Sequence, residues 1–313
     1  ESETASASDL AEKAMSDIAV AHGPRRVAAW AFEKLYRLYG GRYAREMTSW
    51  SDAIGISSGE VAALNCSYEL SHLWEHVGGI RMPIFGCTSG IRFLPGIGMV
   101  HLRSMDWGLS SLGSATRVFR FVDGGREFFS VGIVGFVGVL SGMLPGAYSI
   151  SINWAPPHGR PVFDYGPSFL VREVLETCDS YAEAVDVLAA TNLSTPAFFT
   201  VCGSSRSQGC VIERRRKKAH VRRIRGGVIT QANHHVARGF RDRDDYWYGF
   251  EDDLRDSRSR ASSLRSKMMK LKDTSTLEAA SRCLEVEPVS NAATMQQMAF
   301  APASGHLKLW CRS

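Results

Sequence analysis

Cys87 is a candidate nucleophile within the segment Phe85-Gly86-Cys87-Thr88-Ser89. A cysteine reacts as its thiolate, and its unperturbed pKa of about 8.5 means that a base must take the proton. If the bond between Gly86 and Cys87 were cut, the new α-amino group of Cys87, with a pKa of about 7.7–8.0, would serve as that base. Gly86 has no side chain, which leaves its carbonyl open to the thiol. The pattern therefore predicts a nucleophile that is freed by cleavage after Gly86.

Two charged residues follow Cys87, on a strand that we expect to pair with the strand of the nucleophile. Arg103 would favour the thiolate and hold a substrate oxygen, and Asp106 would accept hydrogen bonds from the new amine. The two residues have opposite parity along a strand, so Asp106 must lie where the strand ends or bulges, near Gly108. A buried structural thiol is the common alternative for any single cysteine.

Two asparagines and several histidines could complete the site. Asn153 and Asn233 each end a predicted strand. Such a residue is often a turn former, but as an oxyanion donor it would lower a barrier by roughly 2.7–4 kcal/mol. A Cys–His pair is the competing arrangement, and its candidate histidines are His101, His158, His220, His234 and His235.

The composition is that of a globular protein. The 313 residues, 44% hydrophobic and 22% charged, suffice for one large or two ordinary domains. The longest apolar run, 131–140, is too short to span a bilayer. Residues 1–9 are polar without a signal pattern, so a cytoplasmic protein and a secreted, periplasmic or lysosome-like one with its signal removed both stay open. The seven cysteines form no CxxC pair of the metal-binding type, and we expect neither metal nor cofactor.

Basic residues gather in two places. The net charge of +5 is concentrated in 213–223, which would suit an anionic partner but is better explained as the solvated turn of a hairpin. No nucleic-acid motif accompanies it, so we expect no nucleic-acid partner. The stretch 25–50 interleaves aromatic and basic residues in a helical pattern. It could make peripheral membrane contact or pack on a core with snorkelling arginines.

The order of predicted elements indicates the fold class. Helices are expected over 10–49, with a further one that begins at the capping box of Ser57 and Glu60. Strands and helices then alternate in blocks, which favours an α+β fold of two antiparallel sheets stacked between helical layers. The expected strands are 88–93, 99–107, 116–122, 127–140, 147–154, 197–203, 209–214, 219–225, 227–232, 295–300 and 306–311, and the expected helices are 167–177, 180–190, 259–271 and 275–286, with a charged loop over 238–260.

Five short segments in order carry a family resemblance. They are Leu64–Glu69, Cys87–Ser89 with Arg103–Asp106, Ser141–Gly146 with Ser149–Asn153, Thr230–Asn233, and Asp252–Ser257. With these segments the chain resembles the acid ceramidase and N-acylethanolamine acid amidase family of N-terminal-nucleophile hydrolases. That family is related more distantly to choloylglycine hydrolases and penicillin V acylases.

The resemblance implies an αββα fold and self-cleavage before Cys87. It would give a helical α-chain, 1–86, and a catalytic β-chain, 87–313, that form a heterodimer. The family hydrolyses lipid-like N-acyl amides. By position, the resemblance implies that Cys87 is nucleophile and base, that Arg103 and Asp106 orient it, and that Asn153 and Asn233 contact the oxyanion.

The chain departs from the family pattern near the expected leaving-group side. Trp154 replaces a glutamate, and His234 and His235 replace Tyr-Asp, so we expect these three residues to contact substrate. Leu254 replaces the first arginine of a pair, so the role of the late arginine would pass to Arg255 or, failing that, to Arg258 or Arg260. Two alternatives stay open. One is acyl transfer or cleavage of penicillin or bile-salt amides on the same scaffold. The other is a catalytically inactive basic protein that binds lipid or nucleic acid.

Overall fold

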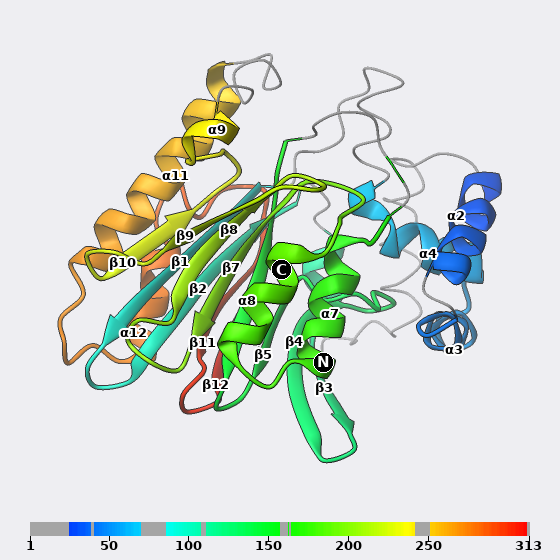
Figure 1. The fold of residues 1–313 in the computed structure, drawn as a ribbon, viewed down its shortest axis with the longest axis horizontal. Helices are drawn as coiled ribbons and strands as arrows, with labels where there is room; N and C mark the ends of the chain where they lie inside the picture. Colours follow the sequence, from blue (N-terminus) through cyan, green and yellow to red (C-terminus); the bar gives the residue numbers. More distant parts are fainter. Residues whose placement is uncertain are drawn as a thin grey trace, which may run out of the picture.

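The computed structural model describes residues 25–38, 41–69, 86–107, 111–156, 162, 164–241 and 251–311. Two antiparallel sheets stack on each other, and helices cover both outer faces (Figure 1). The predicted αββα arrangement is confirmed. The expected first helix, over 10–18, lies outside the described residues. Within those ranges, no helix is long and apolar enough to cross a membrane.

The five-stranded sheet contains the strand of Cys87 near its centre. Its order is β10 (Val228–Gln231), β1 (Gly86–Leu94), β2 (Gly98–Asp106), β11 (Thr294–Ala301) and β12 (His306–Cys311). Helix α11 (Glu251–Met269) packs on β1 and β10, and α12 (Leu277–Ser281) with η1 (Arg282–Leu284) packs on β11 and β2. A Cβ at Gly90 would lie 2.6 Å from the Met268 sulfur, so α11 approaches β1 closely because that position is glycine.

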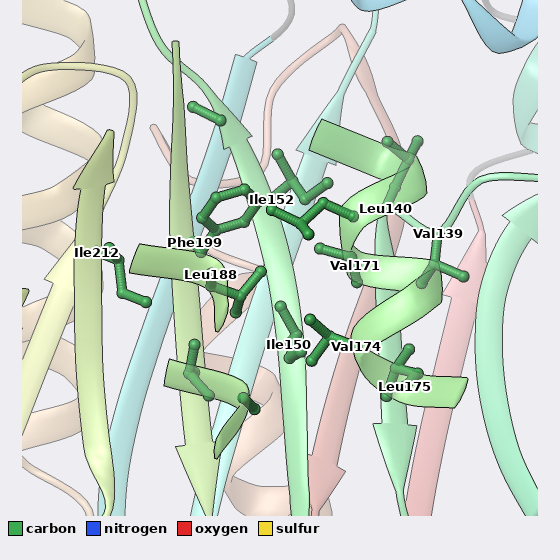
Figure 2. Packing of buried hydrophobic residues seen from close by; sticks show 14 of the residues in the cluster. Val139, Leu140, Ile150, Ile152, Val171, Val174, Leu175, Leu188, Phe199 and Ile212 are labelled. Atoms are coloured by element: carbon green, nitrogen blue, oxygen red, sulfur yellow. The ribbon is translucent and has the colours of Figure 1, made fainter. Parts of the chain in front are cut away.

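The seven-stranded sheet is an antiparallel meander. Its strands are β3 (Thr116–Asp123), β4 (Arg126–Ile133), β5 (Ser141–Leu144), β6 (Tyr148–Trp154), β7 (Ala197–Gly203), β8 (Gly209–Arg214) and β9 (Ala219–Arg223). Helices α7 (Pro167–Thr177) and α8 (Tyr181–Ala190) cover its outer face. Figure 2 shows how Ile150 and Phe199 of the sheet pack against Val171 and Leu188 of these helices. Burial of such side chains contributes roughly 1.5–3 kcal/mol each.

Two predicted elements differ from the structure. The expected strand over 127–140 is shorter, because β4 ends at Ile133, Gly135 adopts a positive φ of 82°, and the next strand, β5, begins only at Ser141. The expected charged loop over 238–260 contains the short helix α9 (Arg238–Arg241), and α11 begins at Glu251. The helical signal in this polar segment is a stripe of buried residues at i, i+3 and i+4 spacing: Leu254, Ser257, Ala261, Leu264 and Met268.

The N-terminal helices pack beside the seven-stranded sheet. The expected aromatic helix is two helices, α2 (Arg25–Leu38) and α3 (Ala44–Ile54), with Gly41 at a φ of 76° between them. Helix α4 (Ser58–Asn65) begins with the predicted capping box of Ser57 and Glu60. Buried side chains of all three helices form a cluster with Val137 and with Phe169 of α7. The three helices therefore share a core with α7 and with the segment between β4 and β5. Helix α6 (Ser111–Ser114) is a single turn before β3.

Candidate functional site

Arg103 lies beside the Cys87 thiol because of the register between β1 and β2. Cys87 pairs with Met105, and Ser89 pairs with Arg103. Residues directly opposite share a face of the sheet, so Arg103 is the diagonal neighbour of Cys87 on that face. Its Nη2 donates to Sγ of Cys87 at 3.2 Å. Arg103 therefore places a fixed positive charge next to the Cys87 sulfur.

Asn153 holds Arg103 in place. The Nη1 of Arg103 donates to Oδ1 of Asn153 at 2.7 Å, and the Nδ2 of Asn153 donates to the carbonyls of Gln231 and Ala232, both at 3.1 Å. Both amide hydrogens of Asn153 are thus taken by main-chain acceptors. These contacts favour a positioning role for Asn153 over the predicted role as an oxyanion donor. The fully buried Arg103 keeps one donor, Nε, that has no hydrogen-bond partner among the described residues.

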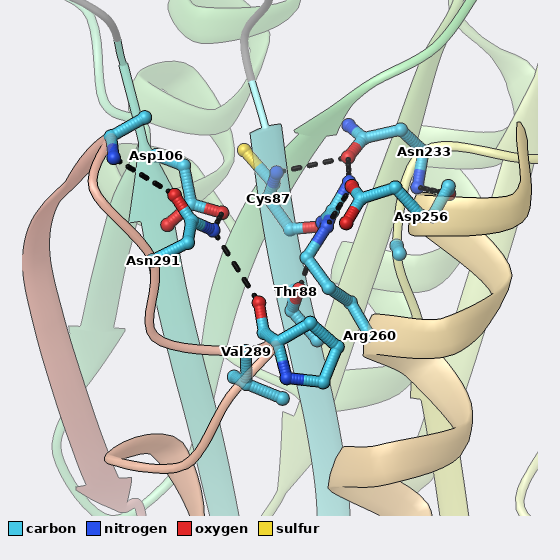
Figure 3. A network of polar contacts seen from close by, with 12 residues as sticks. Cys87, Thr88, Asp106, Asn233, Asp256, Arg260, Val289 and Asn291 are labelled. Atoms are coloured by element: carbon cyan, nitrogen blue, oxygen red, sulfur yellow. Dashed lines mark hydrogen bonds and ion pairs between the residues drawn. The ribbon is translucent and has the colours of Figure 1, made fainter. Parts of the chain in front are cut away.

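Asn233 holds the main-chain nitrogen of Cys87. Its Oδ1 accepts the Cys87 N–H at 2.9 Å and Nη2 of Arg260 at 3.0 Å (Figure 3). Its Nδ2 donates to the carbonyl of Trp154 at 2.9 Å. Asn233 follows β10, the neighbour of β1 on the side away from β2. The nitrogen that cleavage would turn into an amine therefore already faces a buried acceptor.

Of the three candidate late arginines, Arg260 is the one that contacts the Cys87 segment among the described residues. Its Nη1 donates to the Cys87 carbonyl at 2.7 Å and to Oγ1 of Thr88 at 2.9 Å, and its Nε pairs with Asp256 at 2.7 Å. Arg255 and Arg258 are exposed, and Arg255 does not take the predicted catalytic place because it lies on another face of α11. The buried stripe of α11, which Arg260 flanks, is the signal that could have separated them.

Asp106 is the last residue of β2, as its parity required. It lies opposite Gly86, and a Cβ on Gly86 would be 2.9 Å from the Asp106 Cβ. Its carboxylate accepts from Thr294 at 2.6 Å and from Asn291 at 3.1 Å. The irregularity next to it is a register shift in β11, and Gly108 lies outside the described residues. In the intact chain the Cys87 N–H donates to Asn233, and the contact between Asp106 and the amine that cleavage would create stays a prediction.

Apolar and aromatic side chains surround the thiol. Cys87 belongs to the main buried cluster, which also contains Tyr68, Met105, Trp107 and Trp154. Burial, followed by the neighbouring Cys87 sulfur, raises the pKa of Tyr68 well above its usual value. The thiol therefore lies in an environment suited to an apolar acyl group.

The two histidines after Asn233 have separate surroundings. The Nδ1 of His234 lies 2.8 Å from Oγ of Ser257, which also accepts the Asn233 N–H, and burial followed by the charge of Arg258 lowers the pKa of His234 to about 4. His235 is buried edge-on against Phe198, and its Nδ1 lies 3.3 Å from Glu213. His235 thus supports the fold of this loop rather than the expected substrate contact.

No histidine contacts the thiol within the described ranges. The hydrogen bonds of Cys87 go to Arg103, Asn233 and Arg260. His101 lies between the hydroxyls of Ser149 and Ser151, each at 2.9 Å, and burial lowers its pKa to about 3. His158 lies outside the described residues. The part of the chain that the structure describes also has no group of three or more His, Cys, Asp or Glu side chains that could hold a metal ion.

The chain is similar in sequence to two kinds of curated amidase. The N-acylethanolamine-hydrolyzing acid amidase of Caenorhabditis elegans is 28% identical over 207 residues, which cover 61% of this chain and 56% of that protein. The acid ceramidase of Rattus norvegicus is 29% identical over 219 residues, which cover 60% and 52%. The chain thus spans about half the length of the curated relatives it matches. No model of a known protein family matches.

Solved structures show the same fold. The Caenorhabditis elegans N-acylethanolamine-hydrolyzing acid amidase ortholog superposes with a TM-score of 0.59 at 23% identity, covering 72% of this chain and 100% of that chain. A conjugated bile acid hydrolase from Clostridium perfringens gives a TM-score of 0.50 at 12% identity, covering 72% and 89%. The chain therefore has the N-terminal-nucleophile hydrolase fold. Its predicted resemblance to acid ceramidase and N-acylethanolamine acid amidase is confirmed.

Proposed function

We propose that this chain is a self-processing cysteine amidase. It would hydrolyse lipid-like N-acyl amides, of the N-acylethanolamine or ceramide type, to a fatty acid and an amine through a Cys87 thioester. The observation that carries the proposal is the placement of Cys87. Its sulfur contacts Arg103, and its main-chain nitrogen, one bond from Gly86, contacts the Oδ1 of Asn233.

Maturation would divide the chain between Gly86 and Cys87. The sulfur of Cys87 attacks the Gly86 carbonyl carbon, the peptide C–N bond breaks, and the Cys87 nitrogen takes the proton. Water then hydrolyses the thioester and leaves a Gly86 carboxylate and a free amine on Cys87. The close approach of Asp106 to Gly86 leaves no room for a larger residue before the nucleophile.

The mature site would use the amine as its base. The amine takes the thiol proton, the thiolate adds to the acyl carbon, and the proton passes to the leaving amine. The unpartnered Nε and the Nη2 of Arg103 are the cationic donors next to the developing oxyanion. Asn233 and Arg260 keep the Cys87 backbone in place, and Asn153 keeps Arg103 in place.

The buried cluster around Cys87 supports an apolar acyl group. Tyr68 reaches it from the segment that follows α4, and Trp107 and Trp154 reach it from the ends of β2 and β6. The two kinds of curated relative act, by their names, on N-acylethanolamines and ceramides. We infer that Trp154 faces the acyl group, which extends its predicted role in substrate binding.

The two products of cleavage, 1–86 and 87–313, would remain a heterodimer. Arg172 of α7 donates to Glu46 of α3 at 3.1 Å, and Glu176 of α7 accepts from Arg42 at 2.6 Å. The ring of Tyr43 stacks on Phe169 at a centroid distance of 5.5 Å. These contacts do not involve the bond that is cut, so they would persist in the mature protein.

Peripheral membrane contact through 25–50 is the remaining part of the proposal. Helix α2 exposes Trp30, Tyr36 and Leu38, with 37%, 54% and 38% of their surfaces accessible. Aromatic side chains next to arginines suit the boundary between headgroups and acyl chains. Sedimentation with phospholipid vesicles should fall when Trp30 and Tyr36 are replaced by serine, while cleavage is unchanged.

Replacement of the nucleophile tests the proposal. Cys87→Ala should remain a single chain on a denaturing gel and by intact mass, whereas the unchanged protein should yield a fragment that begins Cys-Thr-Ser-Gly. Cys283→Ala, which removes a buried thiol from a different cluster, should be cut normally. Cleavage at 86/87 in the alanine variant would refute the mechanism. Fluorogenic N-acyl amides, with and without an amine acceptor, would separate hydrolysis from acyl transfer.

A further inference from the structure

An open groove of about 700 Å³ lies between β9, β10 and α11, at the end of the molecule away from the N-terminal helices (Figure 1). Its walls contain five arginines and two histidines and, within the described ranges, no carboxylate. We call it the cationic groove. Its basic residues are Arg222, Arg223, Arg225, Arg258, Arg265, His220 and His234.

Most of this charge is not neutralised by neighbouring acids. Arg222 is paired with Glu213. Arg265 donates one bond, to the Val228 carbonyl at 2.7 Å. Arg225 and Arg258 are exposed and form no ion pair among the described residues. Arg258 and Arg265 lie seven residues apart on α11, so they face the groove from the same side of the helix. Several guanidinium groups that share one concavity attract anions strongly.

The arginines of the basic stretch 213–223 have two different kinds of surroundings. Arg214 points inward, where its guanidinium donates to carbonyls at the end of α8, including those of Leu188 and Thr191. Arg222 belongs to β9, as the hairpin interpretation predicted, and faces the groove. The solvated hairpin turn therefore explains only part of the basic stretch. Its remaining residues line the cationic groove together with α11.

We propose that the cationic groove is a binding site for a small ligand that carries a phosphate or another multivalent oxyanion. Guanidinium groups bind such oxygens through paired N–H donors. A single carboxylate would balance one arginine, whereas a phosphate ester or pyrophosphate balances two or more. The groove volume accommodates a phosphate together with an organic substituent, and Val228 and Val236 offer that substituent apolar contacts.

The groove ends next to the candidate active site. His234 belongs to its wall and follows Asn233, whose N–H donates to Ser257 at 2.9 Å, and Ser257 also contacts His234 at 2.8 Å. A ligand in the groove would therefore touch the loop that holds the Cys87 nitrogen. The binding site itself does not depend on the proposed amidase activity.

Direct titration of the full chain tests the site. Pyrophosphate and octyl phosphate represent a soluble ligand, and vesicles of phosphatidylcholine with and without phosphatidic acid represent a lipid headgroup. The double variant Arg225→Gln/Arg258→Gln should weaken binding by about tenfold or more, because it removes two guanidinium groups that would donate charge-assisted hydrogen bonds to the phosphate. Arg120→Gln removes an exposed arginine from β3, at the opposite edge of the same sheet, and should change nothing.

The outcomes separate the possible sources of the ligand. Binding of the soluble phosphates that depends on Arg225 and Arg258 supports a soluble ligand. Binding only to phosphatidic acid vesicles, with the same dependence, supports a lipid headgroup. Absence of binding to either, an equal effect of Arg120→Gln, or tighter binding of duplex DNA than of the phosphates would overturn the proposal. Circular dichroism and Tm without ligand would establish that the variants are folded.

Discussion

Asn65 and Asn233 are two buried asparagines that hold distant segments together, but their partners differ. Asn65, at the end of α4, accepts from the N–H groups of Val137 and Gly138 and donates to the carbonyls of Val61 and Gly135. Among the described residues, all hydrogen-bond partners of the Asn65 side chain are main-chain groups. The oxygen of Asn233 is shared between the Cys87 nitrogen and a guanidinium.

The difference shows that a buried amide can either stabilise the fold or position a reacting group, depending on its hydrogen-bond partners. An amide whose four hydrogen bonds all go to the backbone fixes the path of the chain. An amide that holds the nitrogen of a nucleophile next to a cation positions a reacting group. Asn65 is the last residue of α4, one of the N-terminal helices, whereas Asn233 follows β10, on which α11 packs. The predictions that follow test this division, from the largest expected effect to the smallest.

Replacement of Arg103 should have the largest effect on turnover. Arg103→Ala removes the cationic donors next to the thiol, and kcat for an N-acyl amide should fall roughly 10²–10³-fold, the effect of losing an oxyanion donor. Steady-state kinetics of folded, cleaved protein measure this. Arg92→Ala, at the far end of β1, is the matched control and should leave kcat unchanged. A change of less than threefold for Arg103→Ala would remove Arg103 from the oxyanion site.

Replacement of Asn65 should lower stability and spare chemistry. Asn65→Ala leaves two main-chain N–H groups and two carbonyls without their partner in a buried site, so the free energy of unfolding should fall by about 2–4 kcal/mol. Urea unfolding followed by circular dichroism measures the loss. Asn192→Ala, at an exposed position, is the control. If kcat of the folded fraction fell as steeply for Asn65→Ala as for Asn233→Ala, the contrast between the two asparagines would be lost.

Arg260 and Arg255 form a matched pair on one helix. Arg260→Gln removes the bonds to the Cys87 carbonyl and to Asn233, so self-cleavage and hydrolysis should slow by about 10–100-fold, which corresponds to roughly 1.5–3 kcal/mol. Arg255→Gln removes an equal charge from the exposed face and should have little effect. Rates of chain cleavage on a denaturing gel compare the two. Equal rates would show that Arg260 is not needed to hold the nucleophile.

Glu69 should contribute the smallest and most pH-dependent effect. Burial raises the pKa of Glu69 to about 7, although Ser194 donates to its Oε1 at 2.9 Å. The folded chain therefore binds this proton more tightly than the unfolded chain, whose glutamate pKa is about 4.3. The contribution of protonated Glu69 to the free energy of unfolding is fully present below the unfolded pKa of about 4.3. It is lost as pH rises through 7, with a slope of at most about 1.4 kcal/mol per pH unit.

The comparison of Glu69→Gln with the unchanged protein isolates this slope. The low pKa values of His101 and His234 make stability rise with pH below about 6.5, so only the difference between the two proteins reports on Glu69. Unfolding free energies at several pH values between 4 and 8 measure it. A difference that does not vary with pH would contradict the raised pKa.

Part of the site could be predicted because its signals are local. The spacing of Cys87 and Arg103 places both on neighbouring strands of one hairpin, and parity required Asp106 to end its strand. Ser57 and Ser180 mark helix starts through capping boxes that involve only three further residues. Such features depend on residues close together in the chain, whose geometry the backbone fixes.

The rest of the site depends on contacts between distant segments. Arg260 lies 173 residues from Cys87 and reaches it only because α11 packs on β1. Asn153 and Asn233 look alike in the sequence, but only one of them holds the nucleophile's nitrogen. His235 and His234 are adjacent, but the first turns to Glu213 and the second borders the cationic groove.

The sequence by itself determined the candidate nucleophile, the glycine before it, the arginine beside it and the two-sheet fold, because residue chemistry and short-range periodicity specify them. Only the tertiary structure decided which arginine of α11 faces Cys87, which asparagine positions its nitrogen, and that basic residues of β9 and α11 line one groove. The physical reason is that these choices depend on the register of β10 on β1 and on the rotation of α11 against both strands. Packing of buried side chains over the whole core sets that register and rotation.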